Sequence, residues 1–342
     1  MTDTHLSPST IDINRSIWRQ AVEVCKENDI TTIYHLGDVF DSRKSQTQEM
    51  LLILDELLEM VSNSNIEITI IPGNHDKTDY ESSDSFLKIY RHHPNVQIAN
   101  YLSIHNTSKN LSIPVDTAVV LVPFFSEKSG KYTEVLKGNP SLLDKYKTKF
   151  LLTHIGVNDA VMNGGSVIQD HLEGDIFSDF DKVYVGHFHD YQELKKGKIV
   201  YIGSSYQANY GEDNKKGFQL LNQDGSIEYV KTSFPEYKKV SIDIDSCTKQ
   251  DIQRLKKEYE GSEDNIRFVF QGSKEKLSSV DKAEFSTLGI DVKLEEESAV
   301  VQDYDGEVSS FDSQSILKEW DDFTSEDEDM NKRGKEYLKN NL

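Results

Sequence analysis

One sequence pattern decides the fold, and it is clearest in IEITIIPGNHD at residues 66–76. A short apolar run rich in β-branched residues ends in glycine and then in polar residues. The same pattern recurs in TTIYHLGDVFD (31–41), KFLLTHIG (149–156) and KVYVGHFH (182–189). Runs of this kind are typical of strands that are buried on both faces.

Helical patterns separate these strands. Residues 10–27 carry apolar side chains at helical spacing, and residues 47–61 are rich in leucine and glutamate. Further apolar runs, TAVVLVPFF (117–125) and KIVYIGSSY (198–206), predict additional strands, and a hairpin is expected around Asp224-Gly225. Strands alternating with helices predict an α/β sandwich.

The pattern changes near Pro235. The next residues predict strand, helix, strand, helix and strand in turn, which indicates a small second domain of α+β type. We therefore predict three parts: a main domain at 1–235, a cap domain at 236–296, and an acidic linker with a helical tail at 297–342. A chain of 342 residues is long enough for two cores.

The chain is acidic, with 38 Lys+Arg, 59 Asp+Glu and a formal net charge of −21. Fifteen of the acidic residues lie at 291–329, together with only two lysines. Such a balance argues against broad passive adhesion to nucleic acid. No apolar run is long enough to span a membrane, and two distant cysteines, Cys25 and Cys247, are typical of a reduced compartment. We expect a cytoplasmic protein without a signal peptide.

Polar residues follow the predicted strands at their carboxyl ends, where ligands bind in α/β sheets. Carboxylate, imidazole and amide oxygen suit Mn²⁺, Fe²⁺ or Zn²⁺, and seven such ligands are too many for one tetrahedral ion. They suit two ions that share a carboxylate. Each motif alone is compatible with an ordinary turn, but their joint order is not. The candidate site residues are Asp3, His5, Asp38, Asp41, Asn74, His75, His154, His187 and His189, of which seven would be metal ligands.

The order D-x-H, GDxxD, GNHD, H and GHxH resembles the calcineurin-like metallophosphoesterase superfamily. Within it, GDVFDSRK (37–44) and IVYIGSSYQANYGEDNKKGF (199–218) resemble the SbcD-type double-strand-break repair nucleases, including short phage members. The protein-phosphatase branch would have Arg-Gly after the second Asp, where this chain has Ser42-Arg43. The resemblance implies a four-layer α-β-β-α sandwich with a cap domain and a helical C-terminal tail.

The resemblance also implies roles for the candidates. Asp3, His5, Asp38 and His189 would hold a first divalent ion, and Asp38, Asn74, His154 and His187 a second. Manganese is the ion implied, with magnesium or another divalent ion as alternatives. His75 would face the substrate as a general acid or transition-state stabiliser. We further hypothesise that Asp41 orients His75.

The partners implied are DNA ends, double- and single-stranded, and an SMC-like ATPase of the SbcC type. The reaction would be phosphodiester hydrolysis during DNA recombination and repair. Homodimerisation is expected through helices at 10–27 and 44–62. Contact with the ATPase is expected through apolar residues of the tail, Ile316, Leu317, Trp320 and Phe323. For a phage-encoded member the compartment would be the host cytoplasm.

One feature departs from the pattern, because only Met1 and Thr2 precede Asp3, whereas the family has an apolar strand there. The first strand is therefore predicted to be missing, through a misassigned start or a truncation, with a weakened first metal site. Two other functions stay open. One is a calcineurin-like phosphodiesterase or phosphatase acting on small nucleotides, and the other is a catalytically weakened scaffold that binds the ATPase.

Overall fold

The computed structural model describes residues 1–106, 116–138, 142–162 and 165–296. Residues 1–295 form one compact unit. The predicted acidic linker and helical tail lie outside the described residues, as do the four apolar residues expected to contact an ATPase. In the part of the chain that is described, no helix has the length and apolar character needed to cross a membrane.

A three-stranded parallel sheet carries the GDVFD and GNHD motifs. Its strands lie in the order β1 (Thr32–His35), β2 (Glu67–Ile70) and β3 (Val96–Ile98). The long helices α1 (Ile11–Glu27) and α2 (Gln48–Asn63) supply buried residues to the core that also contains β1 and β2. Thr47 caps the start of helix α2, because its side chain accepts a hydrogen bond from the main-chain nitrogen of Met50.

A six-stranded sheet carries the last two motifs. Its strand order is β4-β5-β6-β7-β9-β8, in which the four central strands are parallel and each edge strand is antiparallel to its neighbour. The strands are β4 (Ser103–Asn106), β5 (Thr117–Val122), β6 (Thr148–His154), β7 (Lys182–Gly186), β8 (Gln192–Leu194) and β9 (Ile199–Tyr201). Helix α3 (Lys131–Lys137) contributes to the core on one face of this sheet.

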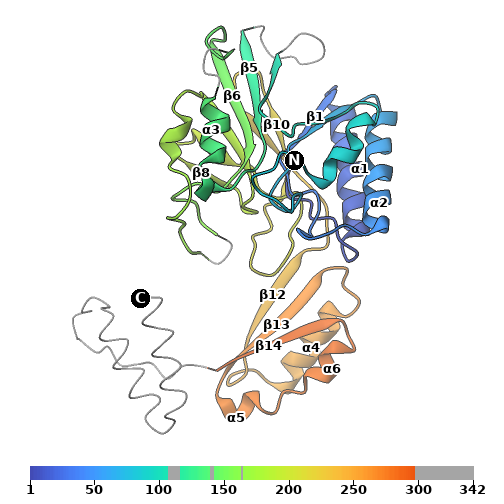
Figure 1. Ribbon diagram of the computed structural model, residues 1–342. Helices are drawn as coiled ribbons and strands as arrows, with labels where there is room; N and C mark the ends of the chain where they lie inside the picture. Colours follow the sequence, from blue (N-terminus) through green and yellow to red (C-terminus); the bar gives the residue numbers. More distant parts are fainter. Residues whose placement is uncertain (107–115, 139–141, 163–164, 297–342) are drawn as a thin grey trace, which may run out of the picture. The chain divides into compact units, whose positions relative to one another are not determined.

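Alternation along the central strands explains why the two sheets stack. In β5, Val119 and Leu121 join one core cluster, whereas Ala118 and Val120 join another. The first cluster also contains Leu36 and Ile71, which directly follow strands β1 and β2 of the smaller sheet, so it lies between the sheets. The second cluster packs under α3. Figure 1 shows α1 and α2 on one side of the sheets and α3 on the other. The expected four-layer α/β sandwich is confirmed.

A hairpin and several short helices also belong to this part of the chain. The predicted hairpin is present, because β10 (Gly217–Leu221) and β11 (Ile227–Lys231) pair antiparallel around Asp224-Gly225. Short 3₁₀ helices occur at Phe86–His92 (η1), Glu127–Ser129 (η2) and Gly174–Phe177 (η4). None of these elements carries a predicted metal ligand.

The residues after Pro235 build a separate sheet in the order β12-β13-β14, with a core of its own. The elements are β12 (Tyr237–Asp243), α4 (Lys249–Tyr259), β13 (Asn265–Gly272), α5 (Lys274–Leu277), α6 (Lys282–Ser286) and β14 (Ile290–Glu296). They follow the predicted order except that two short helices, α5 and α6, stand where one was predicted. The domain boundaries themselves stay a prediction.

The first six residues are all buried and lie along the segment that follows β1. The main-chain nitrogens of Asp3, His5 and Leu6 donate to Gly37, Asp38 and Val39, and Leu36 donates to Met1. No named strand is assigned to them, but Leu6 forms a parallel bridge with Phe40. A short segment is thus enough to hold Asp3 and His5 beside the GDVFD loop.

Candidate metal centre

All the predicted ligands lie at one edge of the two sheets. Strand β1 leads into Asp38, β2 into Asn74, β6 ends at His154, and β7 leads into His187. Because parallel strands present their carboxyl ends at the same edge, four loops far apart in sequence meet there. The N-terminal segment adds Asp3 and His5 to the same place.

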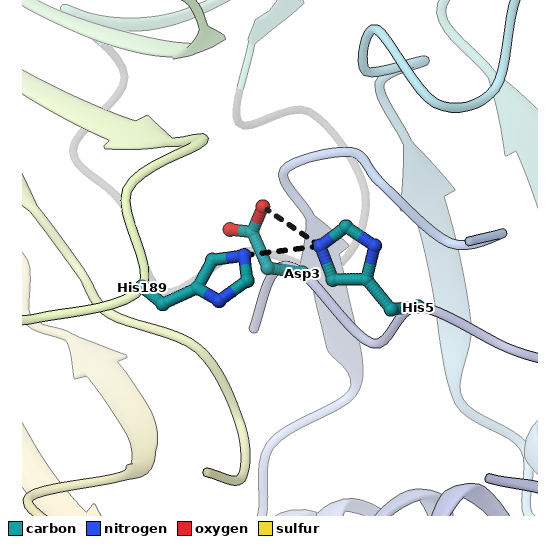
Figure 2. Close-up of side chains that lie close together, drawn as sticks. All are labelled: Asp3, His5 and His189. Atoms are coloured by element: carbon teal, nitrogen blue, oxygen red, sulfur yellow. Dashed lines mark hydrogen bonds and ion pairs between the residues drawn. The ribbon is translucent and has the colours of Figure 1, made fainter. Parts of the chain in front are cut away.

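A first cluster consists of Asp3, His5 and His189. The Nε2 atoms of His5 and His189 are 3.0 Å apart, and His5 Nε2 is 3.9 Å from Asp3 Oδ1. Figure 2 shows the two rings and the carboxylate turned toward one another. Two imidazole nitrogens in this position compete for one proton, whereas a cation would satisfy both lone pairs.

A second cluster forms around Asp38, His154, His187 and Asn74. Asn74 Oδ1 lies 3.0 Å from both His154 Nε2 and His187 Nδ1, and Asp38 Oδ2 lies 3.3 Å from His154 Nε2. With its amide rotated by 180°, Asn74 would instead donate to these atoms and accept from Arg43. The orientation with the oxygen turned inward is the one that a cation stabilises.

Asp38 lies between the two clusters. Its Oδ2 atom is 3.3 Å from His154 Nε2 on one side and 3.9 Å from His5 Nε2 on the other. Its Oδ1 atom accepts a hydrogen bond of 2.8 Å from the main-chain nitrogen of His75. This position is the one required of a carboxylate that bridges two ions.

The backbone is strained at four of these residues. Asp3, His5, Asp38 and His187 have φ of 52°, 40°, 53° and 100°. Non-glycine residues rarely adopt positive φ, and each such residue costs on the order of 1–3 kcal/mol. The surrounding packing maintains this strain, and the strain directs the side chains into the site.

The loops approach so closely that glycine is required at one point. A Cβ atom added to Gly73 would lie 2.2 Å from Asp38 Oδ1 and 2.4 Å from the Asp38 main-chain nitrogen. Contacts this short do not occur between real atoms, so the GNHD loop can approach the GDVFD loop this closely because residue 73 is a glycine.

The electrostatics of the site favour a bound cation. Burial raises the pKa of the Asp3 carboxyl, and burial lowers the pKa of His5 to about 3 and that of His187 well below its usual value. Burial alone would raise the pKa of Asp38 and lower that of His154. Their mutual attraction outweighs burial, so the Asp38 pKa falls well below its usual value and the His154 pKa rises to about 9. Two buried aspartates surrounded by imidazoles are the donor set expected of a divalent metal site, at which a bound cation would displace the proton that Asp38 stabilises on His154.

His75 is held differently from our hypothesis. Its Nδ1 atom hydrogen-bonds the main-chain carbonyl of Asp41, not the carboxylate. The Asp41 carboxylate is 59% exposed and lies 3.6 Å from His5 Nδ1. Asp41 therefore orients His75 through its backbone, because the turn after β1 presents the carbonyl to the ring. Replacement of the Asp41 side chain leaves this contact available.

Sequence reasoning missed Asp76 as a support for the site. Its carboxylate is fully buried and accepts hydrogen bonds from the main-chain nitrogens of Val39, Phe40 and Gly73, at 2.9–3.3 Å. It thereby ties the GDVFD loop to the GNHD loop. Asp76 is the last residue of the GNHD motif, but the motif by itself indicates no supporting role for it.

Sequence reasoning also missed Glu212. Its Oε1 atom accepts a 2.7 Å hydrogen bond from His189 Nδ1, which leaves His189 Nε2 facing the first cluster. The Glu212 side chain is fully buried, and its Oε2 atom lies 3.4 Å from the equally buried Nζ of Lys216. Residue pairs of this kind fix the tautomer and direction of a ligating histidine. Glu212 lies in the segment GEDNKK, whose family resemblance indicates no role for this residue.

A cleft of about 880 Å³ opens onto the two clusters. His5, Asp38, His75, His187 and His189 line it together with Arg43. The residues predicted from sequence therefore meet beside a space large enough for a substrate. Their individual roles as ligands stay predictions.

Comparisons with known proteins agree with this geometry. The family description "Calcineurin-like phosphoesterase" matches residues 1–191. Exonuclease subunit 1 of Enterobacteria phage T4 is 27% identical over 213 residues, which cover 60% of this chain and 57% of the relative. The DNA double-strand break repair protein Mre11 of Thermoplasma acidophilum is 22% identical over 231 residues, which cover 62% of this chain and 57% of the relative.

The chain spans little more than half the length of these two curated relatives. A crystal structure of a dimetal phosphatase from Danio rerio aligns with a TM-score of 0.40 and 11% identity, over 58% of this chain and 84% of that chain. The resemblance drawn from the motifs is confirmed at the level of the family. With the matched region covering more than half of its length and containing every predicted metal ligand, the chain belongs to the calcineurin-like phosphoesterase family.

Proposed function

We propose that this protein is a manganese-dependent nuclease that hydrolyses phosphodiester bonds at DNA ends, as an exonuclease and endonuclease. The observation that carries the proposal is the position of Asp38 between two histidine clusters in one cleft. Two divalent ions, when bound, supply the positive charge that stabilises a phosphoryl group under attack. The names of the two curated relatives, an exonuclease subunit and a double-strand break repair protein, support DNA as the substrate.

The chain's own residues prepare the reaction. Asp3, His5 and His189 would hold one ion, and Asn74, His154 and His187 the other, with Asp38 shared. His75 lines the cleft with Nδ1 donating to the Asp41 carbonyl, so Nε2 is the atom left for the substrate. In the doubly protonated form of the ring, Nε2 would give its proton to the leaving oxygen.

The test uses the full chain, stripped of metal and then titrated with Mn²⁺. We expect about two ions per chain and metal-dependent shortening of an end-labelled duplex. His75→Ala should lower turnover about 10²- to 10⁴-fold with the metal content unchanged. His92→Ala is the matched control, because His92 is exposed on η1 and is not among the residues that line the cleft. Hydrolysis of small phosphodiesters without cleavage of DNA would favour the alternative enzyme, and no bound metal would favour a scaffold.

The proposal includes an SMC-like ATPase of the SbcC type as partner, bound through the C-terminal tail. Deletion of residues 311–342 should abolish co-purification with a co-expressed ATPase and leave nuclease activity intact. Retained co-purification would contradict the assignment of this segment.

The proposed homodimer contact includes α2, where Leu52 is 58% exposed. Leu52→Asp should convert a dimer to a monomer in sedimentation, and an unchanged dimer would exclude this surface.

A further inference from the structure

Arg43 is the only arginine or lysine among the described residues that line the cleft. Its guanidinium Nη2 lies 2.7 Å from His75 Nε2, and its Nη1 lies 3.4 Å from the hydroxyl of Tyr80. Neither of these contacting groups, an imidazole nitrogen and a hydroxyl, is an anion. The positive charge of Arg43 therefore lies in the cleft, beside His75, the residue expected to face the substrate.

Arg43 has no carboxylate partner among the described residues, in contrast to Arg15 and Arg267. Arg15 forms a two-pronged pair with Glu56, and Arg267 pairs with Asp291. Within the described residues, no aspartate or glutamate forms an ion pair with Arg43, although the chain as a whole is strongly acidic. A guanidinium with free donors in a cleft is suited to bind an oxyanion with two parallel hydrogen bonds.

The amide of Asn74 adds a second observation. When its oxygen faces His154 and His187, its nitrogen faces Arg43 Nη2 at 2.9 Å. Two donors then point toward each other without an acceptor between them. An anionic oxygen that draws the guanidinium away from His75 and Asn74 would accept a hydrogen bond from Arg43 on one side and from the Asn74 nitrogen on the other. Both donors would then be satisfied.

We propose that Arg43 binds a non-bridging phosphate oxygen of the substrate, on the side of the site where His75 lies. The inference rests on the proposed function and deepens it by assigning the residue that recognises the phosphate group. Binding of the phosphate releases the guanidinium from His75 Nε2, and that nitrogen then faces the leaving oxygen. Arg43 is thus a catalytic residue that acts by contact with the substrate.

The test compares Arg43→Ala and Arg43→Lys with Lys44→Ala in manganese-loaded full-length protein. Lys44 is exposed on the same loop but does not line the cleft, so its removal matches the change in charge. The first measurement is calorimetric binding of inorganic phosphate, which needs no turnover. We expect Arg43→Ala to weaken phosphate binding about 10- to 100-fold, Arg43→Lys to weaken it less, and Lys44→Ala to leave it unchanged.

The second measurement is the hydrolysis of a p-nitrophenyl ester of thymidine monophosphate. We expect Arg43→Ala to lower kcat/KM by a similar factor, with the melting temperature and the two-ion stoichiometry unchanged. Equal phosphate binding by Arg43→Ala and Lys44→Ala would overturn the proposal. If the wild type binds phosphate through Arg43 but cleaves neither this ester nor DNA, the role of Arg43 stands and the proposed nuclease function fails.

Discussion

Replacing Glu212 with glutamine should weaken binding of one of the two divalent ions about 10- to 100-fold, which corresponds to about 1.4–2.7 kcal/mol. Glu212 accepts from His189 Nδ1 at 2.7 Å and from Asn209 Nδ2 at 3.0 Å through Oε1. Its Oε2 accepts from the Ala208 main-chain nitrogen at 3.0 Å and pairs with Lys216. Glutamine has nearly the same shape, so the change mainly removes charge.

The magnitude follows from these contacts. A hydrogen bond to a charged acceptor contributes about 1 kcal/mol more than one to a neutral acceptor. The buried Lys216 also loses one of its anionic partners, although Asp190 remains 2.6 Å away. Glutamine can also turn its amide nitrogen toward His189 Nδ1, which would favour the wrong tautomer of the ligand.

Calorimetric titration of metal-free protein with Mn²⁺ measures this effect without reference to activity. We expect one of the two binding steps to weaken and the other to stay within about threefold of the wild type. Glu228→Gln is the matched control, because Glu228 is exposed on β11 and does not contact the clusters. Unchanged affinity at both sites, with the melting temperature of the metal-free variant also unchanged, would refute the positioning role of Glu212.

Three further outcomes are expected. Gly73→Ala should lose most metal binding and lower the melting temperature, because its Cβ would overlap the Asp38 carboxylate; calorimetry and thermal unfolding check this. In chelator, the free energy of unfolding should fall as the pH drops below about 6.5, because burial lowers the pKa of His35 in the folded state and the unfolded chain binds the proton first. His35→Gln should reduce that slope by up to about 1.4 kcal/mol per pH unit in urea titrations, and an unchanged slope would contradict this. Thr248→Ala should cost about 1 kcal/mol, since Thr248 and Asp251 form the capping box of α4, whereas Ser279→Ala should cost little.

Much of the fold could be predicted from the sequence because its strands are buried on both faces. Such strands read as continuous apolar runs, and their ends are marked by glycine and polar residues. The runs at 31–36 and 149–154 became β1 and β6, and the helix expected at 10–27 became α1 (Ile11–Glu27). The short N-terminal segment was harder to predict, because its placement depends on hydrogen bonds to residues 36–39 and not on its own length.

The candidate site, like the fold, could be predicted from the sequence only in part. Residue type and order alone identified the seven candidate ligands, since the chemistry of a metal site requires histidine, carboxylate and amide oxygen at strand ends. The supports could not be identified, because a buried carboxylate such as Glu212 and an exposed one look the same in sequence. The orientation of His75 was also beyond reach, since a main-chain carbonyl leaves no signature in residue type.

The sequence by itself determined the class of fold, the family resemblance and the set of candidate ligands, because each depends on local patterns of residue type. Only the tertiary structure decided that Asp38 lies between two clusters, that Glu212 holds His189, and that Arg43 lines the cleft without an ion-pair partner among the described residues. These features join residues up to 184 positions apart. Their geometry is set by the packing of two sheets, which no local pattern records.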